Sequence, residues 1–324
     1  AIWNFYFRPP PIEPASLERM AFQLPEKPSI AVLAFENLSD DPKQEYLSDG
    51  ISEAIISALS KVTDMFVIAR NSSFTYKGKP VKVQQVAEEL GVQYVLEGSV
   101  QRSNDKLRVT AQLIDALKGH HLWSEHYDRK IDDLLDVQDE IAMNVLTETR
   151  VRLTEGEQAL VRKRETNNLK ALEKHMEGVM YLERLNRDDN FKCRQLSEEA
   201  IRLAPKYPGA YRQAGWSHLL DVSLGWSQDP TKSFQLATEY AQKALALDEN
   251  NSETLALWGN IHLFKGEIEK AIEICRRAVG INPNMADATS QLGMALRNAG
   301  RYEEAIPMLE KAIRLNLFPP AWYF

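Results

Sequence analysis

The first half of the chain combines short apolar runs with amphipathic segments. Apolar runs at residues 29–35 (SIAVLAF) and 66–70 (FVIAR) predict two buried strands. Between them, apolar residues recur at helical spacing and predict a helix: Ile51, Ile55, Ile56 and Leu59. The segment VQQVAEEL at 83–90 predicts a second helix, which Gly91 ends.

Three further strands are predicted after this helix. YVLEGSVQR and LRVTAQLID are separated by SNDK, a hairpin signal, and HLWSEHYD follows the turn ALKG. A long amphipathic helix is then expected from Asp132 to Thr154. The order β-α-β-α-β-β-β implies one sheet with helices packed against it.

The second half repeats with a period of 34 residues. Residues of the same type recur 34 positions apart in five pairs: Gly259 and Gly293, Gly266 and Gly300, Ala271 and Ala305, Ala278 and Ala312, and Asn282 and Asn316. Small residues at fixed offsets let paired helices approach closely, and stacked units bury what one unit cannot. This pattern resembles tetratricopeptide repeats, with four units at about 168–206, 208–250, 252–285 and 286–318. The stretch DVSLGWSQDP is interpreted as an insertion or a lengthened loop.

Composition places the chain among soluble globular proteins, with 44% hydrophobic and 26% charged residues. The net charge of −7 argues against a nucleic-acid partner. The two cysteines, Cys193 and Cys275, occupy packing positions of the repeats and are predicted to be buried structural thiols.

No run of 18 apolar residues is present, so no membrane-spanning segment is predicted within the sequence. Near the start, aromatic residues precede Arg8 and three prolines: Trp3, Phe5, Tyr6 and Phe7. This pattern is typical of the interfacial end of a membrane helix, and equally of a tail that docks on its own domain. Both interpretations remain open.

The histidine-rich stretch 107–130 has the highest density of side chains that could bind a metal ion or take part in catalysis. In a strand, His121 points away from His120 and His126, and the latter two lie about 20 Å apart. That separation is too large for one metal ion, so neither a metal site nor a catalytic site is expected here. The loop around Arg70, Asn71, Ser72 and Lys77 is a candidate anion or ligand site. Its alternative is a connection whose Ser and Asn side chains satisfy backbone groups.

Residues 28–151 resemble the TolB-amino-terminal-like domain of bacterial signalling proteins. The stretches that carry the resemblance are SIAVLAFENLSDDPKQEYLSDGISEAIISALSKV, FVIARNSSFTYKGK, VAEELGVQYVLEGSV, LRVTAQLIDALKGHHLWSEHYD and DDLLDVQDEIA. The resemblance implies a mixed sheet with helices, similar to anticodon-binding domains, that follows a transmembrane helix and precedes helical repeats. It further implies an upstream effector in the same polypeptide, usually a class III adenylate or guanylate cyclase. A winged-helix regulator and a Ser/Thr kinase are the alternatives, and the region is expected to be periplasmic, anchored at the bacterial inner membrane.

The expected architecture is therefore an α+β domain followed by an all-α tetratricopeptide-repeat solenoid. Its parts are a tail and Pro-rich linker at 1–27, the α+β domain at 28–151, a helical connector at 152–167 and the array at 168–324. Thr154 and Glu157 predict a capping box at the start of a connector helix. A helical connection is expected to couple the two domains stiffly.

First helices of such arrays line a groove that binds a protein or peptide. By register, the groove residues are Glu253, Asn260, Phe264, Asp287, Met294 and Arg297. The alternative is that these side chains face solvent or the neighbouring domain. Because the Asp pairs 40–41 and 132–133 lie in a loop and at a helix start, they do not form a cyclase metal site. The chain is therefore expected to have no catalytic activity and no cofactor, and a homodimer remains one open alternative for its oligomeric state.

Overall fold

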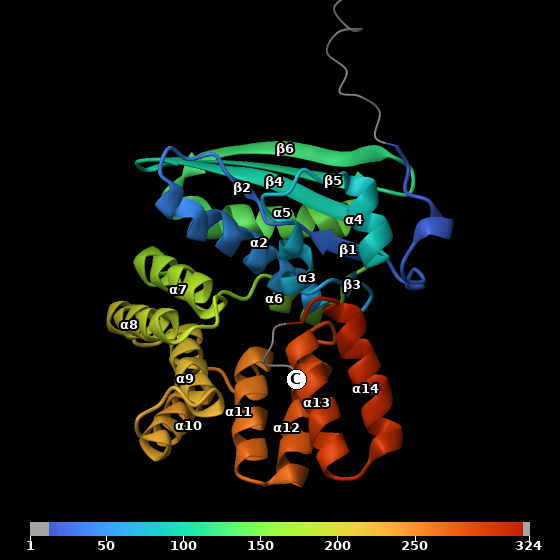
Figure 1. Ribbon diagram of the computed structural model, residues 1–324. Coiled ribbons are helices and arrows are strands. Elements are labelled where there is room, and N and C mark those ends of the chain that lie inside the picture. Colours follow the sequence, from blue (N-terminus) through green and yellow to red (C-terminus); the bar gives the residue numbers. More distant parts are fainter. Residues whose placement is uncertain (1–12, 320–324) are drawn as a thin grey trace, which may run out of the picture.

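The computed structural model describes residues 13–319, with a sheet above and an array of helices below (Figure 1). The sheet has a path of strands in the order β3-β1-β4-β5-β6, and β2 also pairs with β4. β1 is parallel to β3 and β4, whereas β4, β5 and β6 form an antiparallel meander. The strand bounds are β1 (Ser29–Val32), β2 (Glu36–Asn37), β3 (Phe66–Val67), β4 (Tyr94–Ser103), β5 (Lys106–Asp115) and β6 (His120–Lys130).

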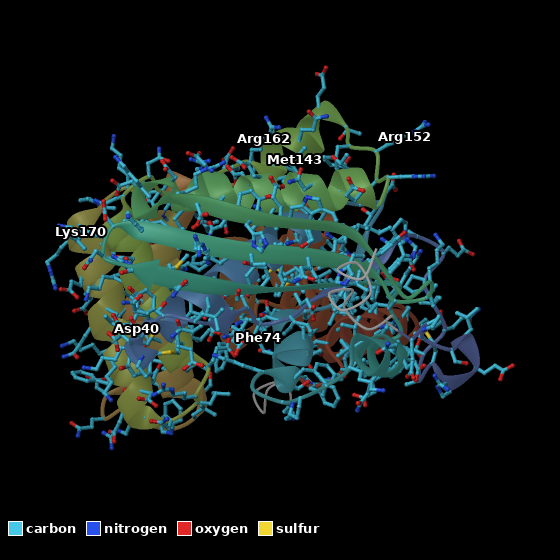
Figure 2. All side chains as sticks on the ribbon, turned by 90° about the horizontal axis from the view of Figure 1, so that it is seen from above. Asp40, Phe74, Met143, Arg152, Arg162 and Lys170 are labelled. Carbon is cyan, nitrogen blue, oxygen red and sulfur yellow. The ribbon has the colours of Figure 1, made fainter. Side chains whose placement is uncertain are left out.

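Two long helices cover the lower face of the sheet, whereas the helix at Val83–Leu90 packs on the opposite face, against Ala31 of β1 and Val95 of β4. The upper face of β5, β6 and the rest of β4 is left open (Figures 1 and 2). The α-helices of this part are α2 (Glu45–Ser60), α3 (Arg70–Ser73), α4 (Val83–Leu90) and α5 (Leu134–Glu148). Its short 3-10 helices are η1 (Leu17–Arg19), η2 (Pro42–Gln44), η3 (Phe74–Tyr76) and η4 (Ile131–Asp133). Ile51 and Ile55 of α2 and Ile141 of α5 are fully buried in one core with Val109 and Leu113 of β5. Alternation along β5 therefore separates the core face from the solvent face.

The expected strands and helices occur in the expected order, with changes at their ends and with two short elements that were not expected, β2 and α3. Arg70, predicted to end a strand, instead begins α3, and Gly91 ends α4 with a positive φ of 60° as predicted. On β6, a register shift leaves Leu122 between the pairs Leu113–Trp123 and Ile114–His121. No group of three or more His, Cys, Asp or Glu side chains within residues 13–319 could hold a metal ion.

The prediction of one helix from Asp132 to Thr154 is wrong, because α5 ends at Glu148. Arg150 has a φ of 57°, and the amide of Val151 donates back to the carbonyl of Leu146 over 3.0 Å. A left-handed residue followed by this bond closes a helix, and Val151 packs against the same hydrophobic core as Leu146. The connector helix α6 (Glu155–Val161) then begins at the predicted capping box of Thr154 and Glu157.

The second half is a tetratricopeptide-like solenoid of helix pairs. The pairs are α7 (Leu169–Leu182) with α8 (Arg187–Leu203), α9 (Pro208–Ser223) with α10 (Pro230–Leu247), α11 (Ser252–Phe264) with α12 (Ile268–Ile281), and α13 (Ala286–Asn298) with α14 (Tyr302–Leu315). The extra residues of the second pair lengthen α9, the loop that precedes Pro230 and the start of α10. No helix within residues 13–319 meets the length and hydropathy needed to cross a membrane.

The repeat register is visible in the packing of glycines. A Cβ on Gly259 would lie 2.5 Å from the Sγ of Cys275, and a Cβ on Gly293 would lie 2.6 Å from Cδ2 of Leu309. Equivalent residues 34 positions apart therefore make equivalent helix crossings. Cys275 and Cys193 are fully buried, and burial raises the pKa of both thiols to about 12.

The array contacts the sheet part at both of its ends. At the first pair, Gly50 of α2 packs so closely on Met176 of α7 that a Cβ would lie 2.5 Å from its Sδ. At the last pair, the amide of Ala69 donates to the carbonyl of Leu315 over 2.8 Å, and Arg314 donates to the carbonyl of Gly91 over 2.7 Å. The two halves are therefore coupled by direct contact, whereas the prediction had assigned the coupling to a continuous helix. The aromatic tail from Trp3 to Arg8 lies outside the described residues.

Candidate functional site

One position of the helical repeat contacts the chain that precedes the array three times. Asp248, Asn282 and Asn316 are 34 residues apart and end α10, α12 and α14. Asn282 donates from Nδ2 to Oγ of Ser60 over 2.9 Å, and Oδ1 of Asn316 accepts from Oγ of Ser72 over 3.0 Å. Asp248 pairs with Nζ of Lys163, just after α6, at 2.7 Å. A repeated polar side chain of the array therefore contacts the sheet part twice and the connector once.

Asn284 makes the densest of these contacts. Its side chain is buried, and its Nδ2 lies 3.0 Å from the carbonyl oxygen of Ser60, 3.1 Å from that of Val62 and 3.0 Å from that of Met65. These carbonyls belong to the C-terminal end of α2 and the turn to β3, where a helix has no backbone donors of its own left to offer. One amide group of the array, with two donor hydrogens, thus serves this cluster of three carbonyls.

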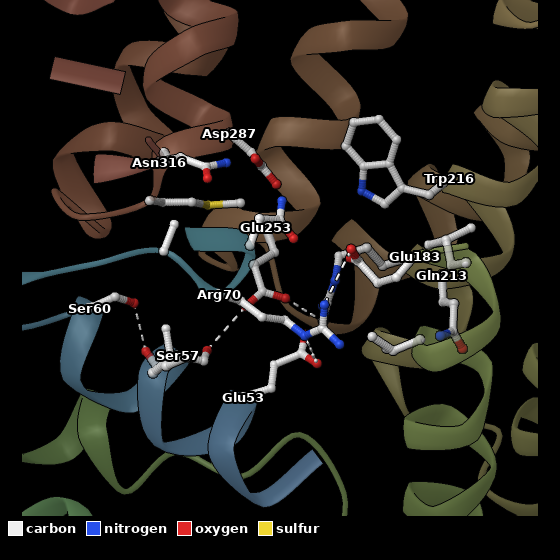
Figure 3. Close-up of a pocket in the computed structure, with 18 of the residues that line it drawn as sticks. Glu53, Ser57, Ser60, Arg70, Glu183, Gln213, Trp216, Glu253, Asp287 and Asn316 are labelled. Atoms are coloured by element: carbon white, nitrogen blue, oxygen red, sulfur yellow. Dashed lines mark hydrogen bonds and ion pairs between the residues drawn. The ribbon is translucent and has the colours of Figure 1, made fainter. Parts of the chain in front are cut away.

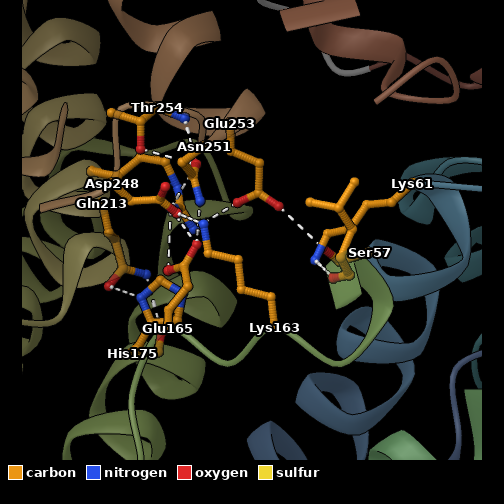
Figure 4. Close-up of polar contacts among 12 residues, drawn as sticks. Ser57, Lys61, Lys163, Glu165, His175, Gln213, Asp248, Asn251, Glu253 and Thr254 are labelled. Atoms are coloured by element: carbon orange, nitrogen blue, oxygen red, sulfur yellow. Dashed lines mark hydrogen bonds and ion pairs between the residues drawn. The ribbon is translucent and has the colours of Figure 1, made fainter. Parts of the chain in front are cut away.

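A buried cluster of charges centres on Arg212 of α9 (Figure 4). Its guanidinium lies 3.0 Å from Oε1 of Glu165 and 2.6 Å from Oε2 of Glu253. Glu253, at the start of α11, also accepts from Oγ of Ser57 on α2 over 3.2 Å. The guanidinium of Arg212 holds the pKa of Glu253 below its usual range, so this carboxylate stays charged although burial opposes it. The cluster connects the array, the connector and the sheet part.

A second cluster centres on Arg70 of α3 (Figure 3). Its guanidinium lies 3.4 Å from Glu53 of α2 and 3.3 Å from Glu183, just after α7, and stacks 4.1 Å from the ring centroid of Phe74. Burial raises the pKa of Glu53 to about 7, and the nearby Arg70 only partly offsets this. The Glu53 side chain lies deep in the interface, yet 37% of it remains accessible through the adjoining cavity.

A cavity of about 260 Å³ lies between these clusters, open toward solvent. Its walls come from both halves and mix apolar side chains such as Ile56, Leu182 and Leu220 with the charged Glu53 and Arg70. Asn316 also lines it and is buried, and its Nδ2 has no hydrogen-bond partner among residues 13–319. The cavity is therefore suited to a small ligand or side chain that carries an acceptor group and an apolar portion.

Glu53 makes the interface sensitive to pH. A carboxyl with a raised pKa in the folded state favours folding in its protonated form, so this contribution is present in acid and is lost as the pH rises through about 7. We expect Glu53→Gln, which stays neutral, to gain stability relative to the wild type between about pH 5 and about pH 8. Urea unfolding at both pH values measures the difference.

Glu310→Gln, at an exposed position of α14, is the matched control for this substitution. A stability difference between Glu53→Gln and the wild type that does not change with pH would contradict the role given to Glu53.

The residues predicted for the groove fall into two groups. Glu253 and Asp287, near the N-terminal ends of α11 and α13, line the cavity and face the sheet part. Asn260 and Met294 are half-buried further along these helices. Phe264 and Arg297, at the distant ends, are exposed. The alternative that groove residues face the neighbouring domain therefore describes Glu253 and Asp287.

The predicted anion loop does not form one site. Arg70 and Asn71 line the cavity, whereas Ser72 is engaged by Asn316. Lys77 lies elsewhere, with Nζ 2.7 Å from Asp49 and 2.8 Å from Glu45. Carboxylates of α2 thus already neutralise the two basic side chains, and anion binding by this loop remains an untested prediction.

Sequence reasoning missed Glu53, Arg212 and Asn284. Glu53 lies among apolar residues of α2, and Arg212 lies on α9, where most residues are buried. An ionisable residue in a mostly apolar helix was therefore the signal that could have identified them. Asn284 lies two residues after Asn282, just beyond the end of α12, where an asparagine resembles an ordinary turn residue.

Comparisons with known proteins match the two halves separately. The family model of the HilA/YgeH-like transcriptional regulator, second domain, matches residues 26–144, and that of subunit 3 of the anaphase-promoting complex, cyclosome, matches residues 231–312. Among individual proteins, the putative adenylate cyclase 3 of Rhizobium meliloti is 40% identical over 238 residues, which cover 72% of this chain and 40% of that protein. The transcriptional regulator HilA of Salmonella typhimurium is 21% identical over 295 residues, 90% of this chain and 51% of that protein.

Among solved structures, a thermophilic tetratricopeptide-repeat protein of Thermus thermophilus aligns with a TM-score of 0.39 at 15% identity. The alignment covers 58% of this chain and 84% of that protein. The chain thus spans about half or less of the length of the cyclase and HilA relatives.

Proposed function

We propose that this chain is a non-catalytic regulatory and protein-interaction module of a larger signalling polypeptide that carries a nucleotide cyclase. The strongest support from sequence is the similarity to the putative adenylate cyclase 3, most of whose length lies outside the match. The sheet part would then be a TolB-amino-terminal-like domain, which its sequence resembles, and it would be related to anticodon-binding domains.

The structural observation that carries the proposal is the closure of the array on α2 and α3. Each buried arginine here bridges two carboxylates, Arg212 those of Glu165 and Glu253, and Arg70 those of Glu53 and Glu183. Such pairing holds two parts in a fixed geometry, and it transmits a change at one part to the other. A partner protein or peptide would bind the outer half of the array, at Asn260, Phe264, Met294 and Arg297.

The test has two arms. This chain alone, incubated with ATP or GTP and Mn²⁺, is expected to form no cyclic nucleotide. In the full-length polypeptide, Arg212→Met should change cyclase activity several-fold, because the substitution loosens the module while the catalytic residues stay intact. Turnover by the chain alone would overturn its non-catalytic role, and unchanged activity in the full-length variant would overturn its regulatory role.

A second candidate function is the sensor region of a transcriptional regulator. The match to the HilA/YgeH-like second domain and the HilA similarity over 90% of the chain favour it. A Ser/Thr kinase effector is the remaining alternative. The upstream reading frame of the gene distinguishes among the three effectors.

We further propose that the module is anchored to the bacterial inner membrane by a preceding helix and lies in the periplasm. The aromatic residues before Arg8 support this placement. Alkaline phosphatase fused after the array should be active in intact cells, and a cytosolic reporter active in the same position would contradict it.

A further inference from the structure

Strand β6 forms a long free edge of the sheet. Among residues 13–319 it pairs only with β5, through the register from Lys106–Lys130 to Asp115–His120. Most of its residues are exposed, Tyr127 being the buried exception. An exposed edge of this length offers a row of backbone donors and acceptors to another strand.

The hydrogen bonds fix which residues of β6 point outward. The amide of Ile131 donates to the carbonyl of Asp105 over 2.8 Å, and these two residues continue the β5–β6 register. Because antiparallel bonds to one neighbour involve alternate residues, the odd-numbered residues of the regular part of β6 bond to β5. The backbone groups of Ser124, His126, Asp128 and Lys130 therefore face the open edge.

The charges on β6 select one partner for that edge. If two copies pair antiparallel about a two-fold axis at Tyr127, Glu125 lies opposite the partner subunit's Arg129. His126 then lies opposite the partner subunit's Asp128, and both residues expose the outward backbone groups that such pairing needs. A two-fold at Glu125 would instead place Glu125 against itself and His121 against the partner subunit's Arg129. Opposite charges across a strand pair stabilise it and like charges destabilise it, so the Tyr127 register is favoured over the Glu125 register. Asp128 also pairs within its own subunit, where its Oδ1 lies 2.6 Å from Nε of Arg108.

Helix α5 runs below and beside this edge (Figure 2), and Nδ2 of Asn144 on α5 lies 3.0 Å from Oη of Tyr127. Its outward acids are already paired within the subunit, because Arg164 lies 2.6 Å from Asp136 and 2.5 Å from Asp139. Glu140 lies 3.9 Å from Arg129. The adjacent surfaces of two copies thus meet with their acidic groups largely neutralised.

From this edge we infer a homodimer: two copies of the chain associate through antiparallel β6–β6 pairing centred on Tyr127, which forms one continuous sheet across both subunits. The inference is independent of the proposed function, because it rests on backbone geometry and charge order alone. The association buries the open edge that each subunit presents.

Sedimentation of the whole chain over a range of concentrations tests this dimer. We expect the wild type to dimerise, and Arg129→Glu to weaken association by roughly tenfold or more, because it sets Glu125 against a second carboxylate on both sides of the axis. The charge exchange Glu125→Lys with Arg129→Glu should restore association. Arg187→Glu, an exposed residue at the start of α8, makes the same charge change away from the edge and should have no effect.

A second variant covers the case in which the charge exchange disturbs folding, since Glu125 also accepts from Trp123 and Tyr127. His126→Pro removes an outward amide without touching the bonds to β5, so it should abolish dimerisation while the circular dichroism stays native. A wild type that remains monomeric at about 100 μM, a concentration at which interfaces of micromolar affinity assemble, would overturn the inference. A dimer insensitive to both Arg129→Glu and His126→Pro would overturn it as well.

Discussion

Replacing Arg212 by methionine is expected to lower the free energy of unfolding by about 3–5 kcal/mol, the typical effect of removing one partner from a buried ion pair. The guanidinium is 9% exposed and lies within 3.0 Å of carboxylate oxygens of both Glu165 and Glu253. Without it, two carboxylates remain in the interface with no cation of equal proximity. Urea unfolding monitored by circular dichroism measures the change.

Two controls separate the role of Arg212 from the general effect of losing an arginine. Arg301→Met removes a surface pair with Glu304 at 2.6 Å and should cost about 0–1 kcal/mol. Adding Glu253→Gln to Arg212→Met should recover part of the lost stability, because the substitution removes one of the stranded charges. Equal losses for Arg212→Met and Arg301→Met would show that the buried cluster does not hold the halves together.

Asn284→Asp is expected to have the second large effect, a loss of about 3 kcal/mol or more, because each buried acceptor left unsatisfied costs about 1–3 kcal/mol. The carboxylate cannot donate to the carbonyls of Ser60, Val62 and Met65 and would face all three with a negative charge. The contact between array and sheet part should open before either part unfolds. Proteolysis between α6 and α7 should therefore become faster, and the unfolding transition should broaden.

The matched control is Asn298→Asp, the same change at an exposed asparagine near the end of α13. It should leave both proteolysis and unfolding unchanged. Equally slow cleavage of Asn284→Asp and Asn298→Asp would show that Asn284 does not hold the array and the sheet part together.

Periodic features of the sequence predicted most of the fold. The strand and helix order, the Gly91 stop, the Thr154 capping box and the helix pairs all follow from local patterns that need no knowledge of distant contacts. The end of α5 was missed because Arg150 takes a left-handed conformation that glycine or asparagine usually provides, so no sequence signal was present.

The interface could not be predicted in the same way, although part of its signal was visible. Asn282 and Asn316 were recognised as a repeated pair, but periodicity shows only that two residues are equivalent. Their contacts with Ser60 and Ser72 join residues more than 200 positions apart. Such contacts depend on the curvature of the whole array, which brings both of its ends to the sheet part. Glu253 and Asp287 were assigned to the groove face of the array, and the structure shows that the sheet part of the same chain meets them there.

Small-angle X-ray scattering of the whole chain tests most directly whether the array and the sheet part form one rigid unit. We expect a pair-distance distribution with a single compact maximum, which Asn284→Asp should broaden and Asn298→Asp should leave unchanged. A wild-type distribution already extended, as from two independently moving bodies, would contradict it.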